Sequence, residues 1–110
     1  MENKVPVSVV VIAKNEENNI VDCLGSCFGW ADEIILVDDE STDRTIEIAK
    51  KFANKVIIKK MLVEGTHRNW AYAQAKNKWV LSLDADESVT PELKQEITGA
   101  IKSDKFVSYS

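Results

Sequence analysis

Histidine, cysteine, proline and glycine are all scarce: the 110 residues include one His, two Cys, two Pro and four Gly. A single His without any C-x-x-C motif argues against a structural zinc site. The two cysteines, Cys23 and Cys27, lie four residues apart in a predicted helix. This spacing favours two buried side chains on one helix face over a disulfide. Such cysteine usage fits a reducing cytoplasm.

The chain also lacks an excess of basic charge and long apolar runs. Fourteen basic and 18 acidic residues give a formal net charge of −4, whereas nucleic-acid-binding proteins normally carry a basic face. We expect no signal peptide, because the apolar run after the polar residues 1–4 is too short, and no membrane-spanning segment. The composition, 45% hydrophobic and 29% charged, is typical of one soluble globular domain.

Apolar, β-branched segments alternate with segments of helical periodicity. Strands are predicted at 7–13, 33–39, 56–58 and 79–83, and a fifth could begin at 105–109. Helices are predicted over about 16–28, after the turn at 40–43, over 66–76 and from Thr90 onward. Asn15 is the expected N-cap of the first helix, and Thr90 with Pro91 opens the last one. This alternation predicts an α/β fold: a single three-layer α/β/α domain over residues 1–110 with a mainly parallel sheet.

Carboxylates follow the apolar run that begins at Trp79. Asp84 and Asp86 lie two residues apart, and both side chains leave the backbone on the same side if extended geometry continues through Ala85. Adjacent carboxylates repel, and a divalent cation with a preference for hard oxygen ligands, Mg²⁺ or Mn²⁺, relieves that repulsion. The alternative is a solvated acidic turn.

Polar clusters occupy equivalent positions after three predicted strands. They lie at 13–16, at Asp38-Asp39 and at 84–87. Because carboxyl ends of parallel strands meet at one edge of the sheet, we expect the three clusters to lie together, where open α/β sheets bind ligands.

The strands and polar clusters together resemble the inverting family 2 glycosyltransferases, which have the GT-A fold. The resemblance is carried by four blocks in the family's order and spacing, residues 7–17, 34–45, 65–71 and 79–87. Residues 82–87, Ser-Leu-Asp-Ala-Asp-Glu, are most similar to the branch that includes lipopolysaccharide core glucosyltransferases.

The resemblance implies roles for individual residues. The wall of the nucleotide pocket would be formed by Ile12, Ala13, Asn15 and Glu16. Asp39 would accept a hydrogen bond from a uracil N–H, Asp38 would brace the turn, and Arg68 would lie near the nucleotide. Asp86 would coordinate Mg²⁺ or Mn²⁺, and Asp84 would contact the ribose or support the metal.

The resemblance also implies partners and a location. The donor would be a nucleotide sugar, a UDP-sugar, and the acceptor a glycan or a lipid-linked acceptor of the lipopolysaccharide type. A complete member runs on for roughly another hundred residues, so we expect these 110 residues to be the donor-binding half, with the general base in the other half. The full-length protein would work in the cytoplasm, peripherally at the inner face of the membrane. An exposed sheet edge would favour a homodimer.

Two other classes fit parts of the pattern. A haloacid-dehalogenase-like phosphatase would use residues 83–89, although that family places its motif on the first strand. A non-catalytic nucleotide-binding module would need only the polar clusters at the carboxyl ends of the strands, without the missing half. Single residues also have plainer interpretations, since Asp39 and Asp43 could cap a helix and Arg68 could form a surface ion pair. A Rossmann dehydrogenase is disfavoured because no G-x-G-x-x-G follows the first strand.

Overall fold

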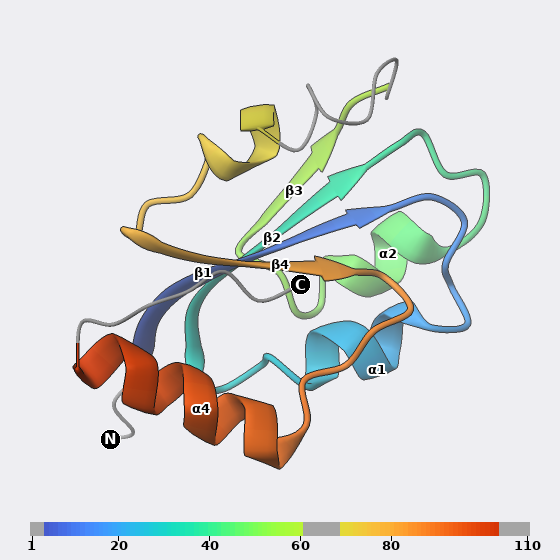
Figure 1. Cartoon of the computed structure of the whole chain (residues 1–110). Helices are drawn as coiled ribbons and strands as arrows, with labels where there is room; N and C mark the ends of the chain where they lie inside the picture. The colour runs from blue at the N-terminus through green and yellow to red at the C-terminus, as the bar shows by residue number, and fades with distance from the viewer. Residues whose placement is uncertain (1–3, 61–68, 104–110) are drawn as a thin grey trace.

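A parallel sheet of four strands forms the centre of the computed structural model, which describes residues 4–60 and 69–103 (Figure 1). The strands are β1 (Val5–Ala13), β2 (Ala31–Asp38), β3 (Lys55–Ile58) and β4 (Trp79–Asp84). Their spatial order is β3-β2-β1-β4, so β1 is central and pairs with both β2 and β4. The predicted α/β fold with a parallel sheet is therefore confirmed.

Helical segments cover both faces of the sheet. Alternate side chains of β1 point to opposite faces: Val9 joins a larger apolar cluster, and Val10 joins a smaller one. The larger cluster is closed by α1 (Ile20–Gly25), α2 (Thr45–Ala49) and α4 (Pro91–Lys102). The smaller cluster is closed by the helical residues 69–72, which lie across the sheet from the other helices in Figure 1. These three layers position the ends of all four strands.

The first helix is shorter than predicted. It begins at Ile20 rather than near residue 16, and Asn19 rather than Asn15 occupies the N-cap position. Asn15 has φ 52°, a left-handed conformation that a helix N-cap does not adopt. The predicted helix runs to residue 28, but α1 ends at Gly25, and the Phe28 side chain beyond it is 57% exposed.

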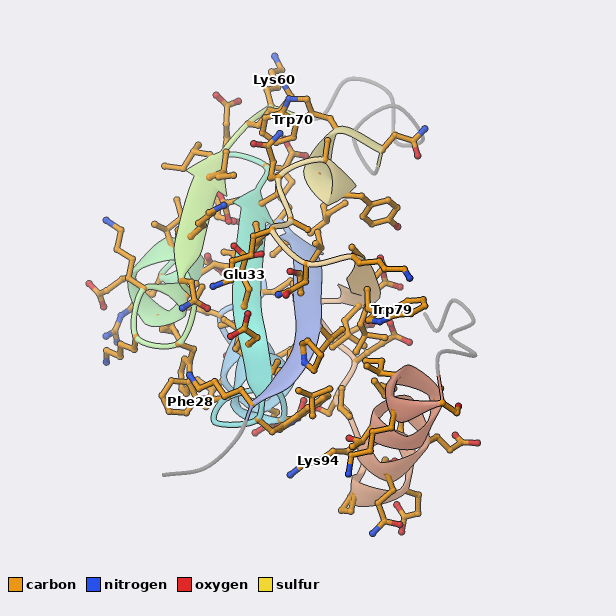
Figure 2. The ribbon with its side chains drawn as sticks, turned by 90° about the vertical axis from the view of Figure 1, so that its left-hand side faces the viewer. Phe28, Glu33, Lys60, Trp70, Trp79 and Lys94 are labelled. Atoms are coloured by element: carbon orange, nitrogen blue, oxygen red, sulfur yellow. The ribbon has the colours of Figure 1, made fainter. Side chains whose placement is uncertain are left out.

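The helix predicted over 66–76 ends early in the described part, where helical geometry stops at residue 72. Beyond the helix, the backbone N–H of Lys76 bonds to a buried side chain, that of Glu33, and not to a helical carbonyl. The Glu33 carboxylate is 2% exposed and accepts hydrogen bonds from Ser8 Oγ at 2.7 Å and from Lys76 N at 2.9 Å. Asn77 N donates to Ser8 Oγ at 3.2 Å, and Lys55 Nζ lies 3.3 Å from Glu33. Figure 2 shows Glu33 against the middle of the sheet, where these contacts tie the chain entering β4 to β1 and β3.

Other local predictions are confirmed. Thr90 is the N-cap of α4, Pro91 is its first residue, and Thr90 Oγ1 accepts from Leu93 N at 3.1 Å. Cys23 and Cys27 are free thiols buried in the larger cluster. The strand predicted at 105–109 falls outside the described residues, as does Arg68.

Candidate functional site

The carboxyl ends of β1, β2 and β4 meet at one edge of the sheet. Ala13 pairs with Asp38, and Ile12 pairs with Asp84, so the three polar clusters begin at the same level. Asp39 N donates to Ala13 O at 2.8 Å, which extends the β1–β2 contact beyond the strands. The prediction that the clusters converge is confirmed. Figure 2 shows Lys60 and Trp70 at this end of the sheet and Phe28 at the opposite end.

The loop after β1 is joined to the loop after β2 through Asn15. Its backbone N–H donates to Ser41 Oγ at 2.8 Å, and its side-chain Oδ1 accepts from Thr42 N at 2.8 Å. These bonds hold Asn15 in its left-handed conformation. The Asn15 side chain, predicted to line the nucleotide pocket, thus bonds to the neighbouring loop.

A second set of bonds joins the same loops one step further along. Glu16 N donates to Thr45 Oγ1 at 2.8 Å, and Glu17 N donates to Asp43 Oδ2 at 3.2 Å. Asp43 Oδ1 also accepts from Thr45 N at 2.9 Å. Slight burial would raise the pKa of Asp43, but the hydrogen bonds from Thr45 and Glu17 outweigh it and hold that pKa below its ordinary value. The N-cap position of α2 is held by Arg44 without a side-chain cap bond, so Asp43 is not the helix cap considered from the sequence, and its carboxylate instead joins the two loops.

The two aspartates at the end of β2 differ in burial. Asp38 is fully buried, and its carboxylate accepts from Ser41 N and Ser41 Oγ, both at 2.7 Å. Asp38 O also accepts from Lys59 N at 2.8 Å, so this residue braces the turn as expected. Asp39 is half-buried at the edge of the sheet. Of the two carboxylates, that of Asp39 is the more accessible to a ligand.

The carboxylates after β4 lie on a turn rather than on a continued strand. Glu87 N donates to Asp84 O at 2.9 Å, which closes the turn, and Glu87 Oε1 accepts from Asp84 N at 2.8 Å. The backbone is therefore not extended through Ala85, and the condition under which Asp84 and Asp86 would leave it on the same side is not met. Asp84 and Asp86 are both exposed, and Ala85 between them is buried. The turn presents the two carboxylates to solvent while Ala85 anchors it in the core.

A buried thiol lies beneath this turn. Cys23 Sγ donates to Asp84 O at 3.6 Å. Burial raises the pKa of Cys23 to about 12, with smaller contributions from Cys27 and from the carboxylates of Glu87, Asp86 and Asp84. Burial likewise raises the pKa of Cys27 to about 11. Both thiols stay protonated at neutral pH and act as packing residues, not as nucleophiles.

The carboxylate oxygens after β4 are suitable ligands for a hard divalent cation, but they are few. Asp84 and Asp86 supply carboxylate oxygens of the type that Mg²⁺ and Mn²⁺ prefer. Among the residues that the structure describes, no three Asp, Glu, Cys or His side chains come together in a way that could hold a metal ion. These residues therefore fit a cation whose remaining ligands are water and phosphate oxygens, as is usual for Mg²⁺.

Reasoning from the sequence missed several residues of this edge. Ser41 and Thr45 join the loops, and Glu87 closes the turn after β4. A weak signal was present for Ser41, since an Asp followed three residues later by Ser is typical of a side-chain-stabilised turn. Nothing local predicts that Ser41 also bonds Asn15, which is 26 residues away.

The sequence profile described as Glycosyl transferase family 2 matches residues 8–110. The chain therefore belongs to this family of glycosyltransferases. An uncharacterised glycosyltransferase of Rickettsia typhi is 40% identical over 106 residues, covering 94% of this chain and 36% of the relative. Poly(ribitol-phosphate) β-N-acetylglucosaminyltransferase TarS of Staphylococcus aureus is 33% identical over 105 residues, covering 86% of this chain and 18% of TarS.

Solved structures of TarS share the fold. The crystal structure of S. aureus TarS 1-349 in complex with UDP superposes with a TM-score of 0.71 at 28% identity, covering 88% of this chain and 32% of that one. The fold is therefore that of the GT-A glycosyltransferases. The chain spans just over a third of the length of its Rickettsia relative. No helix within residues 4–60 and 69–103 is both long and apolar enough to cross a membrane.

Proposed function

We propose that this chain binds the donor of a glycosyltransferase, a UDP-sugar, whose sugar is transferred to a glycan or lipid-linked acceptor. The observation that carries the proposal is the convergence of three strand ends in a family 2 chain. Ala13 and Asp39 are joined by a 2.8 Å bond, and Asp84 pairs with Ile12 beside them. A structural relative of this chain, TarS, was crystallised with UDP, which supports a uridine nucleotide.

The base would lie at the ends of β1 and β2. Ile12 and Ala13 at the end of β1 and the Glu16 region would form its wall, and the half-buried Asp39 carboxylate would accept the uracil N–H. We assign this contact to Asp39 rather than to Asp38, because Asp38 is fully buried against Ser41 whereas Asp39 is half-buried. Arg68, which lies outside the described residues, is assigned to the nucleotide by family resemblance alone.

The diphosphate would lie beside the turn after β4. Asp86 is proposed as a ligand of Mg²⁺ or Mn²⁺, and Asp84 as a contact of the ribose or a further metal ligand. When bound, such a cation neutralises charge on a leaving diphosphate. The protein's own part is to present two exposed carboxylates on a turn held by Glu87 and by the buried Ala85.

Residues 1–110 are proposed as one donor-binding domain. The family resemblance implies that the general base lies outside residues 1–110, so we assign deprotonation of the acceptor to another part of the enzyme. The lipopolysaccharide-type acceptor, the homodimer and association with the inner face of the membrane stay predictions from the family resemblance.

Calorimetric titration with UDP, GDP and ADP tests the proposed nucleotide. We expect UDP to bind in the micromolar to millimolar range, more tightly than the other two, because Asp39 can pair with a uracil N–H. Equal affinity for all three would remove the uracil role of Asp39, and a preference for GDP would change the substrate class.

The proposed metal site is tested by titrating UDP with and without Mn²⁺. Two carboxylates hold the cation weakly alone, so metal and UDP should each raise the affinity for the other by the same factor. Asp86→Asn should abolish most of this coupling, and Asp84→Asn should mainly weaken UDP binding. Asp22→Asn, an exposed carboxylate on α1, is the matched control and should change neither. Mn²⁺-independent UDP binding by the parent chain would contradict the metal assignment.

A further inference from the structure

Ser41 lies at the centre of the hydrogen bonds that join the loops after β1 and β2. Its backbone N–H and its hydroxyl both donate to the Asp38 carboxylate at 2.7 Å. Its hydroxyl oxygen accepts from Asn15 N at 2.8 Å. The hydroxyl donor and one of its acceptor sites are thus occupied by protein partners, so Ser41 acts through its neighbours.

The Asp38 end of this chain of bonds is fixed by the sheet. The Asp38 side chain is fully buried, its Cα pairs with Ala13 of β1, and its carbonyl accepts from Lys59 N at 2.8 Å. A buried carboxylate needs hydrogen-bond donors, and Ser41 supplies two of them. The position of Ser41 is therefore set by β2 and not by the exposed loop around it.

The residues at the Asn15 end of these hydrogen bonds have unfavourable backbone conformations. Asn15 has φ 52°, and Glu40, beside Ser41, has φ 50°. Non-glycine residues adopt this region only when their surroundings hold them there. The bond from Asn15 N to Ser41 is one of those restraints, and the bond from Thr42 N to Asn15 Oδ1 is another.

We propose that Ser41 is a positioning residue of the donor site, which transmits the fixed geometry of buried Asp38 to the Asn15 loop and so shapes the nucleotide pocket before ligand arrives. The inference rests on the proposed function, because it assumes that the nucleotide lies between these two loops. Preorganisation of this kind raises affinity by removing the cost of ordering the loop upon binding.

The test compares Ser41→Ala with the parent in two measurements. Hydrogen exchange of the assigned Asn15 amide, followed by NMR in the ligand-free protein, should become at least about tenfold faster, since its acceptor is gone. The dissociation constant for UDP with Mn²⁺ should rise about tenfold, the loss expected for one well-made hydrogen bond. Ser41→Thr retains the hydroxyl and should restore both values to within about threefold.

Ser8 provides a matched control elsewhere in the sheet. Its hydroxyl also donates to a buried carboxylate at 2.7 Å, that of Glu33, and accepts from the backbone N–H of Asn77. Ser8→Ala should lower the thermal unfolding midpoint and leave both the Asn15 exchange rate and UDP affinity within about twofold of the parent. An equal loss of UDP affinity in Ser8→Ala would show that general destabilisation, not positioning, weakens binding.

The remaining outcomes separate the inference from the proposed function. Faster Asn15 exchange in Ser41→Ala with unchanged UDP affinity would overturn the positioning role while the proposed function stands. Unchanged Asn15 exchange would overturn it as well. If the parent chain binds no UDP at all, the proposed function fails, and the role of Ser41 in donor binding fails with it.

Discussion

Replacing Glu33 by alanine should destabilise the chain by about 3–4 kcal/mol. The estimate follows from the three groups that face the carboxylate. Ser8 Oγ at 2.7 Å and Lys76 N at 2.9 Å both bond Oε1, and Lys55 Nζ lies 3.3 Å from Oε2. The first two bonds are buried and charge-assisted, worth about 1.5 kcal/mol or more each. Lys55 is about half exposed and adds less than about 1 kcal/mol.

Glu33→Gln separates these contributions. A glutamine oxygen in place of Oε1 can still accept from Ser8 and Lys76, whereas its NH₂ group can only face Lys55 as a second donor. We therefore expect a loss of only about 1–2 kcal/mol. Glu96→Ala, an exposed glutamate on α4, is the control and should stay within about 0.5 kcal/mol of the parent.

The effect of Glu33 should also depend on pH. Burial alone would raise its pKa, but hydrogen bonds from Lys76 N and Ser8 and the nearby Lys55 outweigh burial and lower it. A depressed pKa in the folded state stabilises the fold above the ordinary glutamate pKa, and this stabilisation is lost as pH falls toward the folded value. The difference between the parent and Glu33→Gln should thus be largest near neutral pH and shrink in acid.

Urea unfolding followed by circular dichroism measures these free energies, provided that the denaturant slope is the same in all variants. The total stability of a domain is about 5–15 kcal/mol, so Glu33→Ala should remain mostly folded in water and its free energy of unfolding should be measurable. The reasoning is refuted if Glu33→Ala costs under about 1 kcal/mol, or if Glu33→Gln costs as much as Glu33→Ala.

Three further effects should be measurable on the same protein. Thr90→Ala removes the side-chain cap of α4, which bonds Leu93 N, and should cost about 1 kcal/mol in urea unfolding; no loss would mean that the cap is not formed in solution. Asn15→Ala should destabilise more than Asn15→Gly, because only glycine adopts φ 52° without strain; the reverse order would contradict the left-handed conformation. Cys23 and Cys27, whose pKa values are raised to about 12 and about 11, should resist a thiol-specific reagent at pH 8 until urea unfolds the chain; rapid labelling of native protein would show that they are accessible.

The strands and α4 could be predicted because their signals are local. Thr90-Pro91 marks the start of α4, and the β-branched run in β1 marks a strand buried on both faces. The meeting of the polar clusters at one edge followed from parallel topology alone, since all carboxyl ends of a parallel sheet share an edge.

The details of that edge could not be predicted because they depend on contacts between distant residues. Asn15 looked like an N-cap, and the partner that instead holds it, Ser41, lies 26 residues further on. The helix ending at residue 72 rather than 76 has the same cause, since Lys76 N bonds the side chain of Glu33, 43 residues earlier. In both places a tertiary hydrogen bond overrides local propensity.

The turn after β4 is another feature that could be predicted only in part from the sequence. Asp84 and Asp86 were recognised as a pair, but their directions depend on whether the backbone stays extended through Ala85. Glu87 decides this by bonding Asp84 N with its side chain and Asp84 O with its own N–H. Nothing in the local sequence predicts that Glu87 makes both of these hydrogen bonds. The sequence therefore indicates which carboxylates are present but not the directions in which their side chains point.

The central position of β1 has a consequence for how the chain folds during synthesis. β1 is made before the other three strands, yet one of its two neighbours, β4, is made only after β2 and β3; the bond from Asn77 N to Ser8 spans 69 residues. Until β4 docks, one edge of an apolar strand stays unpaired, and such edges promote aggregation. Closing contacts over so long a separation is also slow. Nascent chains that stop short of Trp79 should therefore depend on chaperones that cover extended apolar segments.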